Sequence, residues 1–260
     1  VSHGAKGNTA MNHDKAPNAA YSLLNDPAYY GAVILFVALA TILPALLGSA
    51  WFLLSAQTIA LWLLLLVPLR RNRVRPAVIV LTIWVAIQIA TIFTLSLLAP
   101  NSLELALGDG FRYREALLTW LYAGTALPAS WFSQPFQHLL EILGVTVGAL
   151  VSGGLVGVWF LMRAVNHLAF GGAMLVQSAG GVAGFMAALQ PWALLRIAGY
   201  VGLLPFFALP GYTGDWFPWR HSPARRRLFL ISGALLLGGL TLEAFLPALW
   251  AGWFGPMAGG

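Results

Sequence analysis

Charged positions divide this chain into long apolar stretches. No Asp, Glu, Lys or Arg lies between Asp26 and Arg70, and Arg196 is the only one in the segment 164–214. A helix that crosses a bilayer needs about 20 mostly apolar residues, so each of these two stretches has room for two crossings. The pattern predicts an all-α, polytopic transmembrane bundle of about seven spans. We expect them near 28–46, 50–69, 76–98, 137–163, 166–187, 190–210 and 228–250.

The glycine-rich segment 171–184 leaves the number of spans open. Glycine weakens a helix interior, and irregular backbone at membrane depth is tolerated where protein surrounds it. If this segment is re-entrant and does not cross, six spans are the alternative.

The chain has one folded domain between two polar or short ends. Residues 1–27 are rich in polar and small residues and are typical of a disordered tail. Within this tail, Val1 and Met11 are both candidate start residues. We expect a single transmembrane domain over 28–250 and a short tail over 251–260.

The longest predicted loop, 99–136, contains a segment of mixed character near 111–124. It combines Arg112 and Arg114 with large apolar residues such as Trp120. This mixture is typical of a helix that lies in the membrane interface with its apolar side toward the lipid.

Composition supports lipid as the solvent for much of the surface. Hydrophobic residues make up 59% of the chain and charged residues 8%, whereas soluble domains carry about 25% charged residues. The chain has no cysteine, which excludes disulfides and thiolate chemistry. The net charge is +6, but the basic residues gather in short loops beside apolar spans. We therefore expect anionic lipid headgroups, and not nucleic acid, as their partners.

Two basic loops predict the orientation. The first loop contains Arg70, Arg71, Arg73 and Arg75; the second contains Trp219, Arg220, Arg225, Arg226 and Arg227. Loops rich in Lys and Arg stay in the cytoplasm, so both should lie there. This places the N-terminus inside and the C-terminus outside, in what we expect to be a bacterial inner membrane. The basic residues could set topology alone or also bind headgroups.

Four ionisable residues should lie at similar depth in the outer half of the bundle. They are His138, Glu141, Arg196 and Glu243. Charges inside a membrane are costly and tend to pair, so we expect Arg196 to pair with Glu141 or Glu243. One interpretation is a polar pocket for an ion, a proton or an anionic headgroup. The other is an ion pair that only fixes how the spans pack.

Small residues recur at four-residue spacing, which permits close helix approach. The candidate packing positions are Gly144, Gly148, Ser152, Gly153, Gly157, Gly180 and Gly184. They could serve contacts within this chain or contacts with another membrane subunit.

The sequence contains no catalytic constellation, nucleotide loop or His-Glu-x-x-His pattern, so an enzyme is not favoured. With a fourth span over 137–163, Arg163 and His167 fall near its inner end and His138 near its outer end. Two histidines at different depths cannot hold one haem, so we expect neither a cofactor nor a metal.

Two functions remain in view. The first is a non-catalytic accessory or scaffolding subunit of a membrane assembly, supported by the small-residue faces and the scarcity of polar groups inside the spans. The alternative is a small transporter or channel that uses the outer-half polar cluster.

Overall fold

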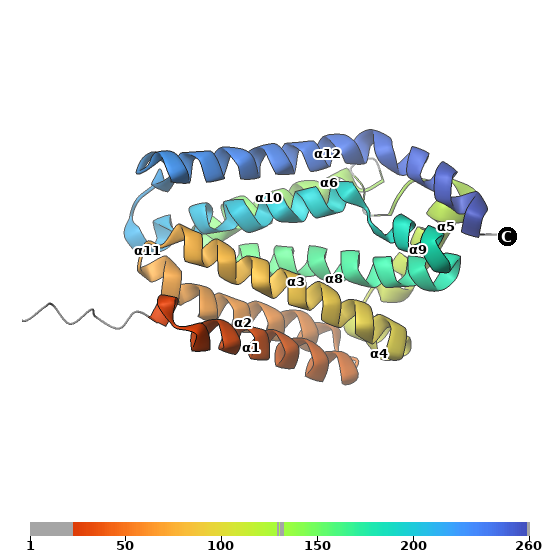
Figure 1. Cartoon of the computed structure of the whole chain (residues 1–260), viewed down its shortest axis with the longest axis horizontal. Coiled ribbons are helices and arrows are strands. Elements are labelled where there is room, and N and C mark those ends of the chain that lie inside the picture. The colour runs from red at the N-terminus through yellow and green to blue at the C-terminus, as the bar shows by residue number, and fades with distance from the viewer. Residues whose placement is uncertain (1–22, 129, 131–132, 259–260) are drawn as a thin grey trace, which may run out of the picture.

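The computed structural model describes residues 23–128, 130 and 133–258, so the predicted tail lies largely outside the described part. Those residues form helices and no strands. Seven segments are long and apolar enough to cross a membrane, which confirms the predicted polytopic helical bundle (Figure 1). No membrane is part of the structure, so which face is cytoplasmic stays a prediction.

The seven candidate spans are built from continuous and broken helices. Four are single helices: α1 Pro27–Leu46, α2 Ala50–Arg70, α3 Val74–Leu98 and α8 Leu155–Ala179. The segment Pro135–Ser152 joins α6 Pro135–Leu143, the π-helix η2 Gly144–Gly148 and α7 Ala149–Ser152. The segment Gly181–Thr213 joins α9 Gly181–Ala188, α10 Pro191–Ala208 and α11 Pro210–Thr213. Last comes α12 Pro223–Ala258, which continues through most of the predicted C-terminal tail. Shorter elements are η1 Leu23–Asn25, α4 Pro100–Leu107, α5 Gly110–Ala123 and η3 Pro218–Arg220.

Two glycines, Gly153 and Gly154, end the fourth span earlier than predicted. Their φ angles are 60° and 99°, a left-handed backbone that glycine adopts at little cost and that ends helices. The turn is anchored because the Gly153 carbonyl accepts hydrogen bonds from Tyr212 Oη at 2.7 Å and Trp62 Nε1 at 3.2 Å. The predicted boundary of 137–163 is therefore wrong.

This shift changes the place of Arg163. It is the ninth residue of α8, which puts it about 12 Å along the helix axis at 1.5 Å per residue. The prediction that Arg163 and His167 lie at the inner end of a span is wrong, because both fall well inside α8.

The glycine-rich segment does not replace a crossing. Helix α8 runs through Gly171 and Gly172 to Ala179, and Gly180 then turns the chain with a φ of 64°. The short α9 packs back against α8 and α12. A second break at Gln190 separates α9 from α10. The two helices together make one interrupted candidate span, so the number of spans stays at seven.

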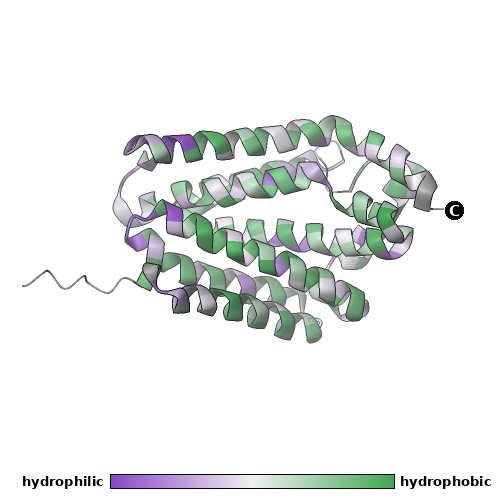
Figure 2. Cartoon of the chain, viewed as in Figure 1, coloured by the Kyte–Doolittle hydropathy of each residue, from purple (hydrophilic) through white to green (hydrophobic). Residues whose placement is uncertain are grey.

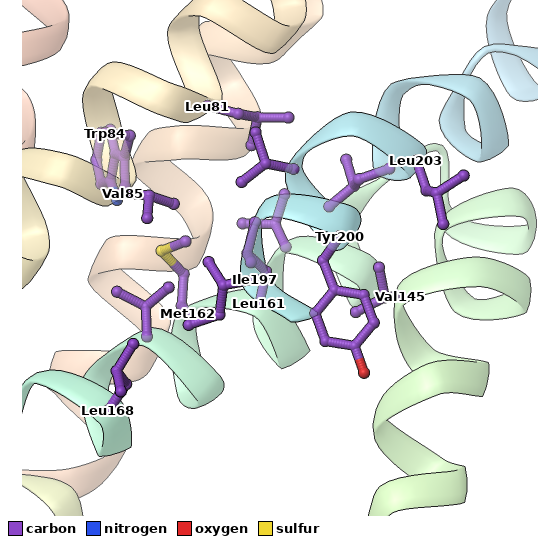
Figure 3. Packing of buried hydrophobic residues seen from close by; sticks show 14 of the residues in the cluster. Leu81, Trp84, Val85, Val145, Leu161, Met162, Leu168, Ile197, Tyr200 and Leu203 are labelled. Carbon is purple, nitrogen blue, oxygen red and sulfur yellow. The ribbon is translucent and has the colours of Figure 1, made fainter. Parts of the chain in front are cut away.

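Figure 2 shows hydrophobic residues along most of each helix and a group of hydrophilic residues at the starts of α3 and α12. Large apolar side chains such as Leu35, Leu63 and Leu237 are exposed, as expected for helices solvated by lipid. The interior is also apolar: Figure 3 shows Leu81, Trp84 and their neighbours packed between helices. Polar side chains buried inside the bundle are therefore exceptions, because both the exposed faces of the helices and the core are mostly apolar.

The two basic loops lie at the same end of the bundle. Arg225 donates from Nη1 to Asn72 Oδ1 at 3.0 Å and from Nη2 to the Asn72 carbonyl at 2.6 Å. The same end is hydrophilic at the starts of α3 and α12 in Figure 2. This arrangement is what an even number of crossings between the loops requires.

Helix α5 occupies the segment predicted to lie in the membrane interface. Its large apolar residues Leu117, Trp120 and Leu121 are buried, and the helix packs against α8 and α12. These three side chains cover the bundle of their own chain, while Phe111 and Tyr122 are exposed; that the helix lies in the membrane interface stays a prediction.

Candidate functional site

A cavity of about 410 Å³ opens beside α5, α6, α8, α10 and α12. We call it the polar cavity. Its ionisable lining residues are Asp109, Arg112, His138, Glu141, Arg163, His167, Arg196 and Glu243. These residues come from segments far apart in the sequence, so the fold gathers most of the interior charge of the bundle at one place.

The structure brings together all four members of the predicted cluster. Arg196 Nη1 lies 2.5 Å from Glu243 Oε2, and Arg196 Nε lies 3.4 Å from Glu141 Oε1. His138 Nε2 lies 2.5 Å from Glu243 Oε1 and 2.8 Å from Arg196 Nη1. Arg196 thus contacts both carboxylates that were predicted as alternatives. We call these four residues the charged quartet.

Glycine at the contact between α10 and α12 explains how the quartet closes. A Cβ on Gly239 would lie 2.7 Å from the Trp192 carbonyl oxygen and 2.8 Å from the Arg196 nitrogen. The two backbones can approach this closely only without that side chain. Glu243 follows one helical turn after Gly239 and therefore faces Arg196. Both Glu243 and His138 are buried, with exposures of 2% and 3%.

With both carboxylates ionised and His138 neutral, the charged quartet has a formal charge of one negative unit. Its two carboxylates carry two negative charges, and the Arg196 guanidinium carries one positive charge. A net charge in a buried site is costly, and one proton on His138 or on a carboxylate cancels it. Nε2 of His138 can carry one hydrogen or accept one hydrogen bond, yet it touches both Glu243 and Arg196. The contacts with Glu243 and Arg196 therefore compete for the same nitrogen of His138.

A second charged group lies across the polar cavity. Asp109 Oδ1 lies 3.0 Å from His167 Nε2, and Asp109 Oδ2 lies 3.6 Å from Arg163 Nη2. Burial tends to raise the pKa of Asp109, but the hydrogen bond with His167 and the charges of His167 and Arg163 outweigh it and lower that pKa. Burial also raises the pKa of Tyr113, whose ring packs edge-on against His167.

His138 and His167 line the same cavity. The prediction that they lie at different depths is wrong, and the cause is the misplaced end of the fourth span. Among the described residues, no group of three or more His, Asp or Glu side chains is placed to hold a metal ion.

No protein-family model, curated protein or solved structure matches this chain. The interpretation of the polar cavity therefore rests on its geometry.

A buried network of amides was not predicted. Asn166 Nδ2 donates to Gln57 Oε1 at 2.8 Å, and Gln88 Nε2 donates to Asn166 Oδ1 at 2.6 Å. Gln88 in turn accepts from Trp84 Nε1 at 2.6 Å. The residues lie on α2, α3 and α8 and are almost fully buried. Because the sequence analysis weighed only charges inside the spans, these neutral side chains gave no signal.

The amide network borders a second cavity of about 270 Å³. Asn166 lines this second cavity, and Asp109, Arg163 and His167 line both cavities. The Asp109 group therefore stands between the polar cavity and the amide network.

The predicted packing glycines fall into two groups. A Cβ on Gly148 would lie 2.5 Å from Val156, and one on Gly157 would lie 2.7 Å from Ala149. Gly144 meets Phe160 in the same way, and Gly184 meets the backbone of α8. Ser152 is a polar link, since its Oγ donates to the Gly148 carbonyl and accepts from Val156 N.

Two of the predicted packing positions lie at turns. Gly153 and Gly180 each follow a helix end with a left-handed φ. A Cβ on Gly153 would lie 2.8 Å from Tyr212 Oη, so this position also allows a close approach, whereas one on Gly180 would have open space.

The basic loops present most of their arginines to the outside. Exposed members are Arg70, Arg71, Arg73, Arg75, Arg220, Arg226 and Arg227. Arg225 differs because it is partly buried on Asn72, and Trp219 stacks on Phe229 with ring centroids 4.6 Å apart. The exposed arginines are accessible to headgroups, which keeps the predicted lipid role open.

Proposed function

We propose that this integral membrane protein is a small transporter that moves a polar solute together with a proton. The charged quartet carries this proposal: a buried group with two carboxylates and one guanidinium, which one added proton would neutralise, forms the wall of a cavity large enough for a small solute. Pockets that bind small molecules typically start at about 300 Å³, and the polar cavity exceeds that size.

The broken helices support the same proposal. Helix α10 begins beside the polar cavity after the interruption at Gln190, and Gln190, Trp192 and Ala193 all line it. Secondary transporters commonly bind substrate where interrupted helices leave polar backbone near the middle of the membrane. A structural ion pair alone requires neither an open cavity nor an interrupted helix next to it.

The accessory-subunit function is the second candidate. It relied on small-residue faces that could receive another subunit. Three of these positions, Gly144, Gly148 and Gly157, pack against α8 or α7 of their own chain. They are therefore not available for contact with another subunit. A partner on the exposed apolar surface stays a prediction, and purification in mild detergent tests it: a stoichiometric partner would support this candidate.

Transport is tested in proteoliposomes that contain the pH dye pyranine. A panel of small solutes is added outside, and proton entry is followed. We expect at least one solute to drive proton entry in the wild type, and Glu243→Gln to abolish it because the quartet then needs no further proton. The matched control is Glu115→Gln, which changes an exposed glutamate on α5 outside the cavity lining. Equal proton entry in the wild type and in Glu243→Gln would refute the proposal.

The orientation is part of the proposal. With both basic loops in the cytoplasm, the quartet lies in the outer half of a bacterial inner membrane. Reporter fusions after residues 73 and 222 should both report the cytoplasm. Opposite sides for the two fusions would contradict the assignment.

A further inference from the structure

Two helices begin at the polar cavity with the same dipeptide. Helix α6 starts at Pro135 after Gln134, and α10 starts at Pro191 after Gln190. Gln134 and Gln190 both line the cavity. A helix N-terminus carries a partial positive charge and backbone N–H groups without partners inside the helix. Helix α10 is 18 residues long, so its dipole is fully developed at this end.

Gln190 adds an observation that does not depend on the helix ends. Its side chain is buried, with an exposure of 3%, and its Nε2 finds no hydrogen-bond partner among the described residues. A buried amide donor is costly to leave unpaired. Gln190 lines the polar cavity, so a rotation of its side chain would bring this donor to an acceptor on a bound solute.

Two arginines that line the cavity have guanidinium groups with long ion-pair contacts or none. Arg163 reaches Asp109 only at 3.6 Å and is 41% exposed. Arg112 lines the cavity, is exposed, and makes no ion pair within 4.0 Å in the part of the chain that the structure describes. Two of the three carboxylates are fully engaged: His138 and Arg196 hold Glu243, and His167 holds Asp109. Glu141 Oε1 lies 3.4 Å from Arg196 Nε and accepts no hydrogen bond from the described residues. The unused groups are thus mainly donors.

The charge balance points the same way. Three arginines and three carboxylates line the cavity, so their formal charges cancel. When the quartet takes up its proton, the cavity carries one excess positive charge, which the helix ends reinforce. A bound anion removes this excess. Anion and proton should therefore bind together.

We propose that the polar cavity binds a small oxyanion, such as a carboxylate or a phosphate, through Gln190, the N-terminus of α10 and Arg163. This inference rests on the proposed function and names the chemical class of its solute. The oxyanion accepts the hydrogen bond that Gln190 Nε2 offers and pairs with Arg163. Because an added proton gives the cavity an excess positive charge, proton binding and oxyanion binding favour each other, and the affinity for the oxyanion rises as the pH falls.

Thermal stability of the purified protein in detergent tests this inference without requiring transport. The probes are sodium salts of acetate, pyruvate, succinate, citrate and phosphate, compared with choline chloride and glucose at matched ionic strength. We expect one or more oxyanions to raise the melting temperature of the wild type, more at pH 6 than at pH 8. In Gln190→Met, which keeps the side-chain length but removes the donor, the apparent Kd should rise about tenfold.

Three further variants separate weaker binding from an effect on folding alone. Arg163→Gln should weaken the same oxyanion at least as strongly, because a charge-assisted contact is lost. Gln177→Met, on α8 outside the cavity lining, and Arg71→Gln, in a basic loop, should leave the Kd unchanged. If Gln190→Met does not fold, Arg163→Gln alone decides the outcome by the same criterion.

The outcomes separate this inference from the transport function. If only choline or glucose stabilises the protein, the oxyanion assignment is overturned. The assignment is also overturned if no oxyanion stabilises the protein while solute-driven proton entry is still observed. Both outcomes leave proton-linked transport standing. Oxyanion binding unchanged in Gln190→Met and Arg163→Gln overturns the assigned site. If the wild type binds an oxyanion but no solute drives proton entry, the result supports the inference and contradicts transport. Repeating the titration with added phosphatidylglycerol distinguishes a free oxyanion from a headgroup phosphate, because a headgroup in the cavity would compete.

Discussion

Two adjacent glycines in α12 give the sharpest test of how the quartet is positioned. A Cβ on Gly239 would lie 2.7 Å from the Trp192 carbonyl oxygen, whereas one on Gly238 would have no heavy atom within 4 Å. Favourable carbon contacts lie at about 3.5–4.0 Å. Gly239→Ala therefore forces α10 and α12 apart by roughly 0.8–1.3 Å, while Gly238→Ala fills open space.

The matched pair isolates the steric cost. Both substitutions gain the same helix propensity, about 1 kcal/mol in water, so the difference between them reports packing alone. Overpacking typically costs about 1–3 kcal/mol. We expect Gly239→Ala to unfold at a temperature several degrees below Gly238→Ala, measured by intrinsic fluorescence in one detergent. Solute-driven proton entry should also fall in Gly239→Ala, because Glu243 lies one turn away. Equal melting temperatures would refute the close approach of α10 and α12.

Three other substitutions probe separate parts of the fold. Asn166→Leu should destabilise the protein by about 1–3 kcal/mol, because the facing amides lose their partners; chemical denaturation measures the loss, and an unchanged midpoint would contradict the network. Folding lowers the pKa of Asp109 below its ordinary value of 3.8, so its stabilising effect is full above that pH and is lost only as the pH falls further. Asp109→Asn should therefore lower the melting temperature equally at pH 5 and pH 7, and a loss confined to pH 7 would oppose this assignment. Arg225→Gln should lower stability by about 1 kcal/mol through its contacts with Asn72, whereas exposed Arg226→Gln should not; identical melting curves would count against the link between the two basic loops.

The sequence predicted the number of spans because lipid imposes a simple rule on length and polarity. It also predicted the quartet, since charges in apolar spans must pair and Glu141, Arg196 and Glu243 fell at similar depth. The same rule misplaced the end of the fourth span, because Arg163 was taken as a terminal charge. The better signal was the pair Gly153–Gly154, since adjacent glycines readily adopt the left-handed backbone of a helix end.

Other parts of the site could not be predicted from depth alone. Asp109 belongs to a loop, and its contact with His167 depends on how α4 and α5 pack against the bundle. Gln190 and Asn166 are neutral, so nothing in their chemistry required a partner at a particular depth. Their importance appears only when burial and hydrogen bonding can be assessed together.

The distances in the polar cavity show which contact a ligand would replace. The quartet is held by contacts of 2.5–3.4 Å, and Asp109 meets His167 at 3.0 Å. The contact between Asp109 and Arg163 is longer, at 3.6 Å, and both side chains remain partly exposed. An oxyanion that pairs with Arg163 would therefore displace the longest of these ion pairs and leave the charged quartet intact. Since Asp109 directly precedes α5, which packs against α8, exchanging the contact between Asp109 and Arg163 would connect solute binding to the position of α5, while the contact of Asp109 with His167 remains.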